Sequence, residues 1–271
     1  MALTDNTPIP DYAGMFSLAG RGVVVLGAGQ GIGRQSAHAA AAAGAKVACV
    51  DLDIERARSV AEELGGTAHA ADVTNSDEMH RLSSEVHGSL GRVDALIDII
   101  GMPRFGPILD MSDEDWDFQQ DINLRQAFLA MREFGRLMKA DGGGAMAFVS
   151  SISGGRSSPG HAGYGAAKAG LISLIASAAN EMGPHNIRVN GVAPGTTLTP
   201  RMTVNLPENE RAGAARRIPM QRLGQPSDIA SVLLFLISDL SSYVSGEVIR
   251  VDGAATTTHP VTMNATRIRG S

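Results

Sequence analysis

Seven short apolar runs recur along the chain, and longer segments of mixed polarity separate them. The runs are residues 22–26, 46–50, 68–71, 95–100, 145–150, 188–192 and 248–251. Each has the length and composition of a buried parallel strand, and the segments between them suit helices. Such alternation is typical of βαβ units. The pattern therefore predicts an α/β fold: a doubly wound Rossmann-type domain with seven parallel strands and helices on both faces.

No repeat, low-complexity linker or break in composition divides the chain. We therefore expect one domain over residues 16–253, preceded by an N-terminal extension (1–15) and followed by a C-terminal tail (254–271). Ligands of a doubly wound sheet bind at the carboxyl ends of its strands, so functional residues should follow the strands. The long irregular stretch at about 194–219 is expected to be a mobile loop or short lid that contacts the substrate.

The composition excludes several classes of protein. It is 44% hydrophobic and 19% charged, with a mean hydropathy near zero, which is typical of a globular chain and not of a disordered or membrane-spanning one. A formal net charge of −5 gives no overall attraction to nucleic acid. The N-terminus lacks a basic segment followed by an apolar stretch, so a cytoplasmic protein is expected.

Cysteine and acidic residues give no indication of a metal site. Cys49 is the only cysteine and lies inside an apolar run, so we expect it to be a small buried hydrophobic residue. The acidic run of Asp113, Glu114 and Asp115 suits the first turn of a helix, where negative charge is favourable. No metal ion is expected.

A glycine-rich turn follows the first predicted strand. Gly27, Gly31 and Gly33 stand between Leu26 and an alanine-rich segment. Glycines permit a sharp turn here and let backbone N–H groups approach a pyrophosphate at the helix N-terminus. The small alanines let that helix pack closely on the sheet. The turn therefore predicts a dinucleotide site.

Asp51 ends the second predicted strand, 18 positions beyond Gly33. A carboxylate there can accept hydrogen bonds from both ribose hydroxyls of the adenosine and would repel a 2′-phosphate. The neighbouring Leu52 offers no cation to bind a 2′-phosphate, so NAD is predicted and NADP is less favoured. Arg34 and Arg56 are the cations that could still bind the 2′-phosphate of NADP. The alternative is that Asp51 is a helix-capping or turn residue.

Tyr164 and Lys168 are four residues apart in a small, apolar segment that suits a buried helix, so their side chains share a face. Oxidation of an alcohol needs a base for the hydroxyl proton, and a free tyrosine is mostly protonated at neutral pH. A nearby ammonium, together with the positive ring of an oxidised nicotinamide, would lower the tyrosine pKa. The pair predicts a proton-transfer centre. Ser151, at the end of the fifth strand, is the expected second donor to the substrate oxygen, with Ser150 and Ser153 as competitors.

From about Phe16 to Gly253 the chain resembles the short-chain dehydrogenase/reductase family. The glycine turn is similar to the family's Thr-Gly-x-x-x-Gly-x-Gly, with Leu26 in place of the threonine. Asp72 and Val73 resemble its adenine-contacting pair, although Asp72 could instead cap the following helix. The other matching segments are 116–124, Ser151 with Tyr164 and Lys168, Asn190 with Pro194 and Gly195, Arg222-Leu-Gly-Gln-Pro, and Val251-Asp-Gly.

The resemblance implies roles for particular residues. Asn123, Ser151, Tyr164 and Lys168 would form a catalytic tetrad, in which Lys168 also holds the nicotinamide ribose and Asn123 keeps a water that relays protons from Lys168 to solvent. Thr196 to Thr199 would meet the nicotinamide carboxamide. The expected cofactor-binding residues are Gly27, Gly31, Ile32, Gly33, Asp51, Leu52, Asp72, Val73, Gly101, Tyr164, Lys168, Pro194, Gly195, Thr197 and Thr199.

Two features depart from the family pattern. Where the family usually has Asn-Asn-Ala-Gly, this chain has Asp98-Ile99-Ile100-Gly101. The Asp98 side chain could point to a solvent pocket or accept a backbone N–H. The tail, which includes Thr266-Arg-Ile-Arg269, is longer than the common pattern and could cover a neighbouring subunit's site.

These expectations converge on an NAD-dependent secondary-alcohol dehydrogenase or ketoreductase. The alternatives are an NADPH-linked reductase of 3-oxoacyl thioesters and a dinucleotide-binding regulatory protein without turnover. His161 could face the substrate or simply lead into its helix. Four apolar residues could either line a substrate pocket or simply pack in the core: Met102, Phe105, Ile152 and Met202.

The resemblance also implies a homotetramer, formed through two long helices at about 113–139 and 161–182. A face of small residues on the second helix would permit close approach of another subunit. Its members are Ala166, Ala169, Ser173 and Ala176.

Overall fold

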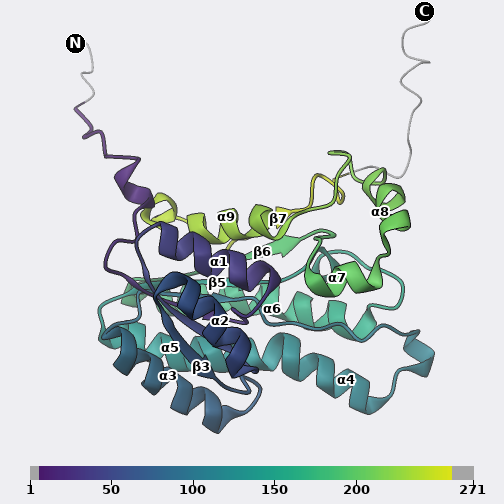
Figure 1. Ribbon diagram of the computed structural model, residues 1–271, viewed down its shortest axis with the longest axis horizontal. Helices are drawn as coiled ribbons and strands as arrows, with labels where there is room; N and C mark the ends of the chain where they lie inside the picture. The colour runs from purple at the N-terminus through teal and green to yellow at the C-terminus, as the bar shows by residue number, and fades with distance from the viewer. Residues whose placement is uncertain (1–5, 258–271) are drawn as a thin grey trace, which may run out of the picture.

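The computed structural model describes residues 6–257 and contains one seven-stranded parallel sheet (Figure 1). The strands are β1 (Gly22–Leu26), β2 (Lys46–Asp51), β3 (Thr67–Ala70), β4 (Ala95–Asp98), β5 (Gly144–Val149), β6 (Ile187–Pro194) and β7 (Val248–Val251). Their order is β3-β2-β1-β4-β5-β6-β7. The chain starts at the centre, winds outward to β3 and then crosses back to β4. The predicted doubly wound fold is confirmed.

Helices cover both faces of the sheet (Figure 1). One face carries α3 (Ser76–Leu90), α5 (Gln126–Ala140) and α6 (Ala162–Met182). The other face carries α1 (Gly31–Ala42), α2 (Ile54–Leu64) and α9 (Pro226–Ile237). The remaining helices, α4 (Asp113–Gln120), α7 (Pro200–Asn205) and α8 (Glu208–Ala215), lie in the connections after β4 and β6.

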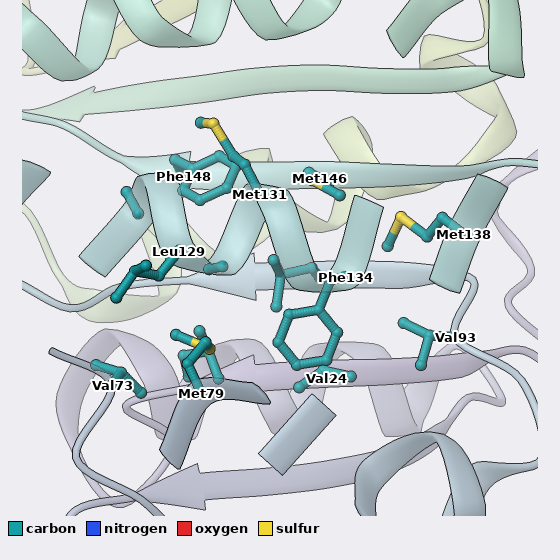
Figure 2. Packing of buried hydrophobic residues seen from close by; sticks show 14 of the residues in the cluster. Val24, Val73, Met79, Val93, Leu129, Met131, Phe134, Met138, Met146 and Phe148 are labelled. Atoms are coloured by element: carbon teal, nitrogen blue, oxygen red, sulfur yellow. The ribbon is translucent and has the colours of Figure 1, made fainter. Parts of the chain in front are cut away.

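Alternate residues of each strand belong to two separate hydrophobic cores, because successive side chains of a strand point to opposite faces. In β1, Val24 and Leu26 pack toward α3, α5 and α6, whereas Val23 and Val25 pack toward α1, α2 and α9. Figure 2 shows the first of these cores, in which Phe134 of α5 lies between the strands and α3. Both faces are therefore apolar, as continuous apolar runs predict.

Cys49 of β2 belongs to the second core and is fully buried. Burial raises the pKa of its thiol to about 12, with a smaller contribution from the charge of Glu63. The expectation of a small buried hydrophobic residue is confirmed.

Two sequence expectations about helices need correction. The stretch at 194–219 is not irregular throughout, because it contains α7 and α8. The helix expected at 113–139 is interrupted by a π-helical turn, η3 (Asp121–Arg125), between α4 and α5. The acidic residues 113–115 do form the first turn of α4, which Ser112 caps by accepting the N–H of Asp115 at 3.1 Å.

Parts of the predicted extension (1–5) and tail (258–271, including Thr266 to Arg269) lie outside the described residues. Within residues 6–257 no helix is both long and apolar enough to cross a bilayer. The same part of the chain holds no group of three or more His, Cys, Asp or Glu placed to bind a metal ion.

Candidate active site

Tyr164 and Lys168 lie one turn apart on α6, as their spacing predicts, with the Lys168 Nζ 5.8 Å from the centre of the Tyr164 ring. The side chain of Lys168 is almost completely buried, with 1% exposure. Its Nζ donates to the carbonyl oxygens of Val149 at 2.8 Å and Ile100 at 3.3 Å. The ammonium is thus held by the carboxyl ends of β4 and β5.

Burial lowers the pKa of Lys168 to about 8, and the charge of Asp98 opposes this change. A buried ammonium loses its hydration, and two carbonyl dipoles replace only part of it. Lys168 therefore loses its proton more readily than an exposed lysine.

Ser151 follows β5 and begins the 3₁₀ turn η4 (Ile152–Gly154) by accepting the N–H of Ser153 at 3.1 Å. Burial raises the pKa of Tyr164, and a hydrogen bond with the Ser151 side chain opposes that rise. Desolvation has the larger effect. The expectation that Lys168 and an oxidised nicotinamide together lower the tyrosine pKa stays a prediction.

The two serines that competed with Ser151 have other contacts. The Ser150 hydroxyl is buried and donates to the backbone carbonyl of Lys168 at 3.2 Å. Ser153 contributes its backbone N–H to Ser151. Of the three, Ser151 is the one whose side chain bonds to the Tyr164 phenol.

Asn123 lies in the π-helical turn between α4 and α5 and is fully buried. Its Oδ1 accepts the N–H of Met102 at 3.0 Å, and its Nδ2 donates to the carbonyls of Met102 and Gln119, both at 2.9 Å. The extra residue of a π turn widens the helix locally, which turns Asn123 toward the end of β4. Its amide fixes the chain just beyond that strand.

Gly101 brings Asn123 and Lys168 together. A Cβ at this position would lie 2.9 Å from both the Asn123 Oδ1 and the Lys168 Nζ. Glycine is the only residue that leaves both polar atoms in place. It is also the one position of the family's Asn-Asn-Ala-Gly segment that this chain keeps.

The glycine turn between β1 and α1 has the shape that a pyrophosphate site needs. Gly27 and Gly31 have positive φ values of 82° and 56°. A Cβ on Gly33 would lie 1.9 Å from the Gly27 carbonyl oxygen, so only glycine allows α1 to pack against the turn. No described side chain caps the first turn of α1. Its N–H groups are therefore free to bind an anion, and the turn fits a dinucleotide pyrophosphate.

Asp51 faces this turn from the end of β2. Its Oδ2 accepts the N–H of Gly29 at 3.0 Å, and its Oδ1 accepts the N–H of Asp53 at 3.1 Å. The helix-capping alternative is wrong, because Asp53 caps α2. The alternative that Asp51 is a turn residue is correct in part, because its carboxylate accepts the N–H of Asp53 in the turn after β2. Leu52 next to it is 74% exposed.

The two arginines that kept NADP open are both paired with carboxylates. Arg34 donates to Glu63 at 2.5 Å, and Glu63 also contacts His38 at 2.7 Å. The Arg56 Nε lies 3.3 Å from the Asp53 carboxylate. Both pairs are substantially exposed, so each is a weak interaction that a stronger anion could replace.

Asp72 forms a local turn after β3. Its Oδ1 accepts the N–H of Thr74 at 2.9 Å and the Thr74 hydroxyl at 2.6 Å. Its capping alternative is wrong, because Asn75 caps α3. Val73 is buried in the core beside it.

The segment after β6 lies opposite the glycine turn. A Cβ on Gly31 would lie 3.4 Å from the Cδ of Pro200 and 3.5 Å from the Cβ of Thr199. Thr199 caps α7, and the Thr197 hydroxyl donates to the Gly195 carbonyl at 3.1 Å. Residues 194–199 and the start of α1, which includes the half-buried Ile32, therefore border one region. Asn190, by contrast, is buried and bonded to the backbone of Val244 and Glu247.

Near Tyr164, the rings of His161 and Phe105 meet edge to face with centroids 4.6 Å apart. The His161 ring lies 6.1 Å from that of Tyr164, and its Nδ1 lies 2.9 Å from the carbonyl oxygen of Pro159. Phe105 is 58% exposed, so it is not ordinary core packing. Met102, Ile152 and Met202 are half-buried, and both readings stay open for them.

Three residues at this site were not singled out from the sequence. Gln119 is fully buried, and its Oε1 accepts the N–H of Arg104 at 3.1 Å. Gln126 lies 3.5 Å from Asp98, and Arg201 of α7 reaches the Gly101 carbonyl at 3.5 Å. Gln119 could have been found from the sequence, because it lies one helical turn before Asn123. The contacts of Gln126 and Arg201 join segments that are far apart in the sequence, so the sequence alone does not indicate them.

A cavity of about 540 Å³ lies between Gly165, Ala166 and Ala169 of α6 and the loop at 153–160, and His161 also lines it. Ser151, Tyr164 and Lys168 do not line it. Through His161, whose ring lies 6.1 Å from that of Tyr164, the cavity adjoins the region around the phenol.

Comparison with known proteins gives consistent relatives. A family model described as "Enoyl-(Acyl carrier protein) reductase" matches residues 27–256. The 3-oxoacyl-[acyl-carrier-protein] reductase FabG of Thermotoga maritima is 38% identical over 241 residues, which cover 87% of this chain and 98% of that protein. The (3R)-3-hydroxyacyl-CoA dehydrogenase of Mus musculus is 36% identical over 244 residues, 85% of this chain and 94% of the relative.

Among solved structures, a 7α-hydroxysteroid dehydrogenase complexed with NADH and 7-oxo glycochenodeoxycholic acid has a TM-score of 0.85 and 32% identity. The match covers 89% of this chain and 96% of that one. These relatives share nearly the whole described fold.

Proposed function

This chain belongs to the short-chain dehydrogenase/reductase family of oxidoreductases, and on that premise we propose that it transfers hydride between a secondary alcohol or ketone and NAD(H). One observation carries the proposal: a half-buried Tyr164 whose phenol is bonded to Ser151, with the Lys168 ammonium one helical turn behind it. A phenol so placed can exchange a proton with a substrate oxygen that the serine hydroxyl holds.

In reduction, Tyr164 gives its proton to the developing alkoxide, while Ser151 donates a second hydrogen bond to the same oxygen. In oxidation the phenolate accepts the proton of the alcohol. The nicotinamide, when bound, supplies or takes up the hydride. Lys168 stabilises the phenolate by its charge and passes protons on, and the buried Asn123 holds the relay beside it. The raised tyrosine pKa suits the phenol form, and the reductive step needs that form.

NAD(H) is favoured by Asp51, whose carboxylate is aimed at the turn where a ribose would lie. The exposed ion pairs of Arg34 and Arg56 are too weak to exclude a 2′-phosphate, so the preference for NAD(H) rests on Asp51. We propose the same cofactor-binding residues as the sequence predicts. The closeness of Gly31, at the start of α1, to Thr199, in the segment after β6, supports this proposal.

A second candidate is an NADPH-linked 3-oxoacyl thioester reductase. Two relatives named for 3-oxoacyl-[acyl-carrier-protein] reduction, at 38% and 36% identity, favour this substrate class. The (3R)-3-hydroxyacyl-CoA dehydrogenase relative favours a thioester substrate as well. A regulatory protein without turnover is less favoured, because Asn123, Ser151, Tyr164 and Lys168 are all present.

The test is a spectrophotometric screen of NAD(H) and NADP(H) against secondary alcohols, ketones and 3-oxoacyl thioesters. Tyr164→Phe should lose turnover by a factor on the order of 10² or more, yet bind NADH as the wild type does, measured by fluorescence. Tyr243→Phe, on a fully exposed tyrosine, is the matched control. Undiminished turnover of Tyr164→Phe would end the mechanism, and turnover with NADPH and thioesters alone would favour the second candidate.

A further inference from the structure

Asp98 is a buried carboxyl group that the proposed mechanism does not use. It ends β4 and is 2% exposed, so the expectation of a solvent pocket is wrong and that of a backbone contact is correct. Its Oδ1 accepts the N–H of Ile100 at 2.9 Å and lies 3.5 Å from the Gln126 Nε2. Among the described residues, its Oδ2 has no hydrogen-bond partner, and neither has the Gln126 Oε1.

A single residue, Ile100, connects Asp98 with Lys168. The Ile100 N–H donates to Asp98, and the Ile100 carbonyl accepts the Lys168 Nζ at 3.3 Å. The two side chains therefore approach opposite ends of the same short backbone segment. A charge on one acts on the other through a dry interior, where electrostatic interactions are strong.

The groups that surround the Lys168 ammonium come from several elements. Tyr164 precedes it on α6, Asn123 approaches from η3 across Gly101, and Asp98 ends β4. On α7, the exposed Arg201 reaches the Gly101 carbonyl. Asp98 is the only carboxyl among them, and its charge is the one that raises the pKa of Lys168.

We propose that Asp98 is a positioning residue for Lys168: it is the buried counter-ion that keeps the ammonium charged to a higher pH than a neutral residue at the same place would. The inference rests on the proposed function, in which Lys168 belongs to the proton-transfer site. Burial without water disfavours the ammonium, and a full negative charge offsets more of that cost than the two carbonyl dipoles do. The family's usual asparagine cannot supply this charge.

Asp98 also has a protonated state, which bears on its unpartnered Oδ2. Burial raises the pKa of Asp98 to about 6, against the effects of the Ile100 N–H, the Lys168 charge and Gln126. A proton on Oδ2 makes it a donor, and the Gln126 Oε1 is the buried acceptor on the adjoining side chain. Asp98 and Lys168 are thus both charged between about pH 6 and pH 8.

The direct test uses the three lysines of the chain, Lys46, Lys139 and Lys168. With ¹³C-labelled lysine, NMR follows each side chain as it titrates, and Lys46→Arg and Lys139→Arg assign the signals. In Asp98→Asn the Lys168 midpoint should fall by about one pH unit, the scale on which a nearby opposite charge acts. Asparagine keeps the acceptor for Ile100 and adds a donor for Gln126, so we expect this variant to fold.

Asp94→Asn is the matched control, because Asp94 lies just before β4, at the end of the strand away from Asp98, and accepts the N–H of Gly22 at 2.9 Å. It should leave the Lys168 midpoint in place. An unchanged midpoint in Asp98→Asn, or the same shift in both variants, would overturn the proposal.

The pH profile of kcat/KM gives an independent readout. The alkaline fall in Asp98→Asn should begin about one pH unit lower than in the wild type, with near-normal activity below it. A uniform loss at every pH with an unshifted Lys168 midpoint would mean that Asp98 acts by packing alone and would overturn the counter-ion role. If no substrate is turned over, the proposed function fails, and the NMR comparison still decides the role of Asp98.

Discussion

The pKa values of the titratable groups at this site depend more on burial than on ion pairs with neighbouring side chains. Tyr164, Lys168 and Asp98 all have pKa values moved toward their neutral forms, and loss of water is the largest cause in each. Each neutral form is the easier one to place in a dry interior. Replacing a neighbouring charged or hydrogen-bonding group should therefore change which of these three side chains are protonated.

A stability prediction follows for Asp98. Its folded-state pKa is raised from 3.8 to about 6, so its favourable contribution is present at low pH and is lost as pH rises through about 6. Relative to Asp98→Asn, the wild type should lose up to about 3 kcal/mol of unfolding free energy between about pH 4 and pH 7. Urea denaturation of both proteins at several pH values measures it. A difference that stays constant with pH would contradict the raised pKa.

Among the elements, the junction of β1, the glycine turn and α1 tolerates the least change. In Gly33→Ala the new methyl group would collide with the Gly27 carbonyl, so α1 must move away from the turn. We expect NADH affinity to fall by about tenfold or more, measured by fluorescence titration.

Gly88→Ala, in the exposed interior of α3, is the matched control for Gly33→Ala. Nothing lies within 4 Å of its added Cβ. It should raise the free energy of unfolding by about 0.5–1 kcal/mol and leave NADH affinity unchanged. Equal NADH affinity in both variants would count against the glycine turn as the pyrophosphate site.

Local pattern was enough to predict the strands and the shared face of Tyr164 and Lys168, because both depend on residues close in sequence. It was not enough for α7 and α8, which are short and sit in a connection with little apolar periodicity. The π turn around Asn123 has no sequence signature of its own. The partners of Asp98 and Arg34 come from distant segments, which one sequence does not pair.

At the scale of the whole molecule, the outer face of α6 is a surface that could contact another subunit. Ala166, Ala169, Ser173 and Ala176 are all exposed, so the expected face of small residues exists. Trp116 of α4 and Phe128 of α5 are 41% and 44% exposed. Exposed aromatic residues and small residues that permit close helix approach are both typical of subunit contacts.

We therefore keep the prediction of a homotetramer. Sedimentation velocity should show a tetramer for the wild type and smaller species for Ala169→Arg, which places a long cation on the small-residue face. Ala212→Arg, on exposed α8, should leave the oligomeric state unchanged. A wild-type protein that sediments only as a monomer would refute the expectation.

The burial of Cys49 has a practical consequence. Its thiol is fully enclosed and its pKa is raised to about 12, so almost none of it is present as the reactive thiolate at neutral pH. A cysteine introduced at Val204, which is 80% exposed on α7, would then be the only site to react with a maleimide. A fluorophore or spin label placed there would report any movement of α7 beside the proposed dinucleotide site, and the native cysteine would not have to be removed.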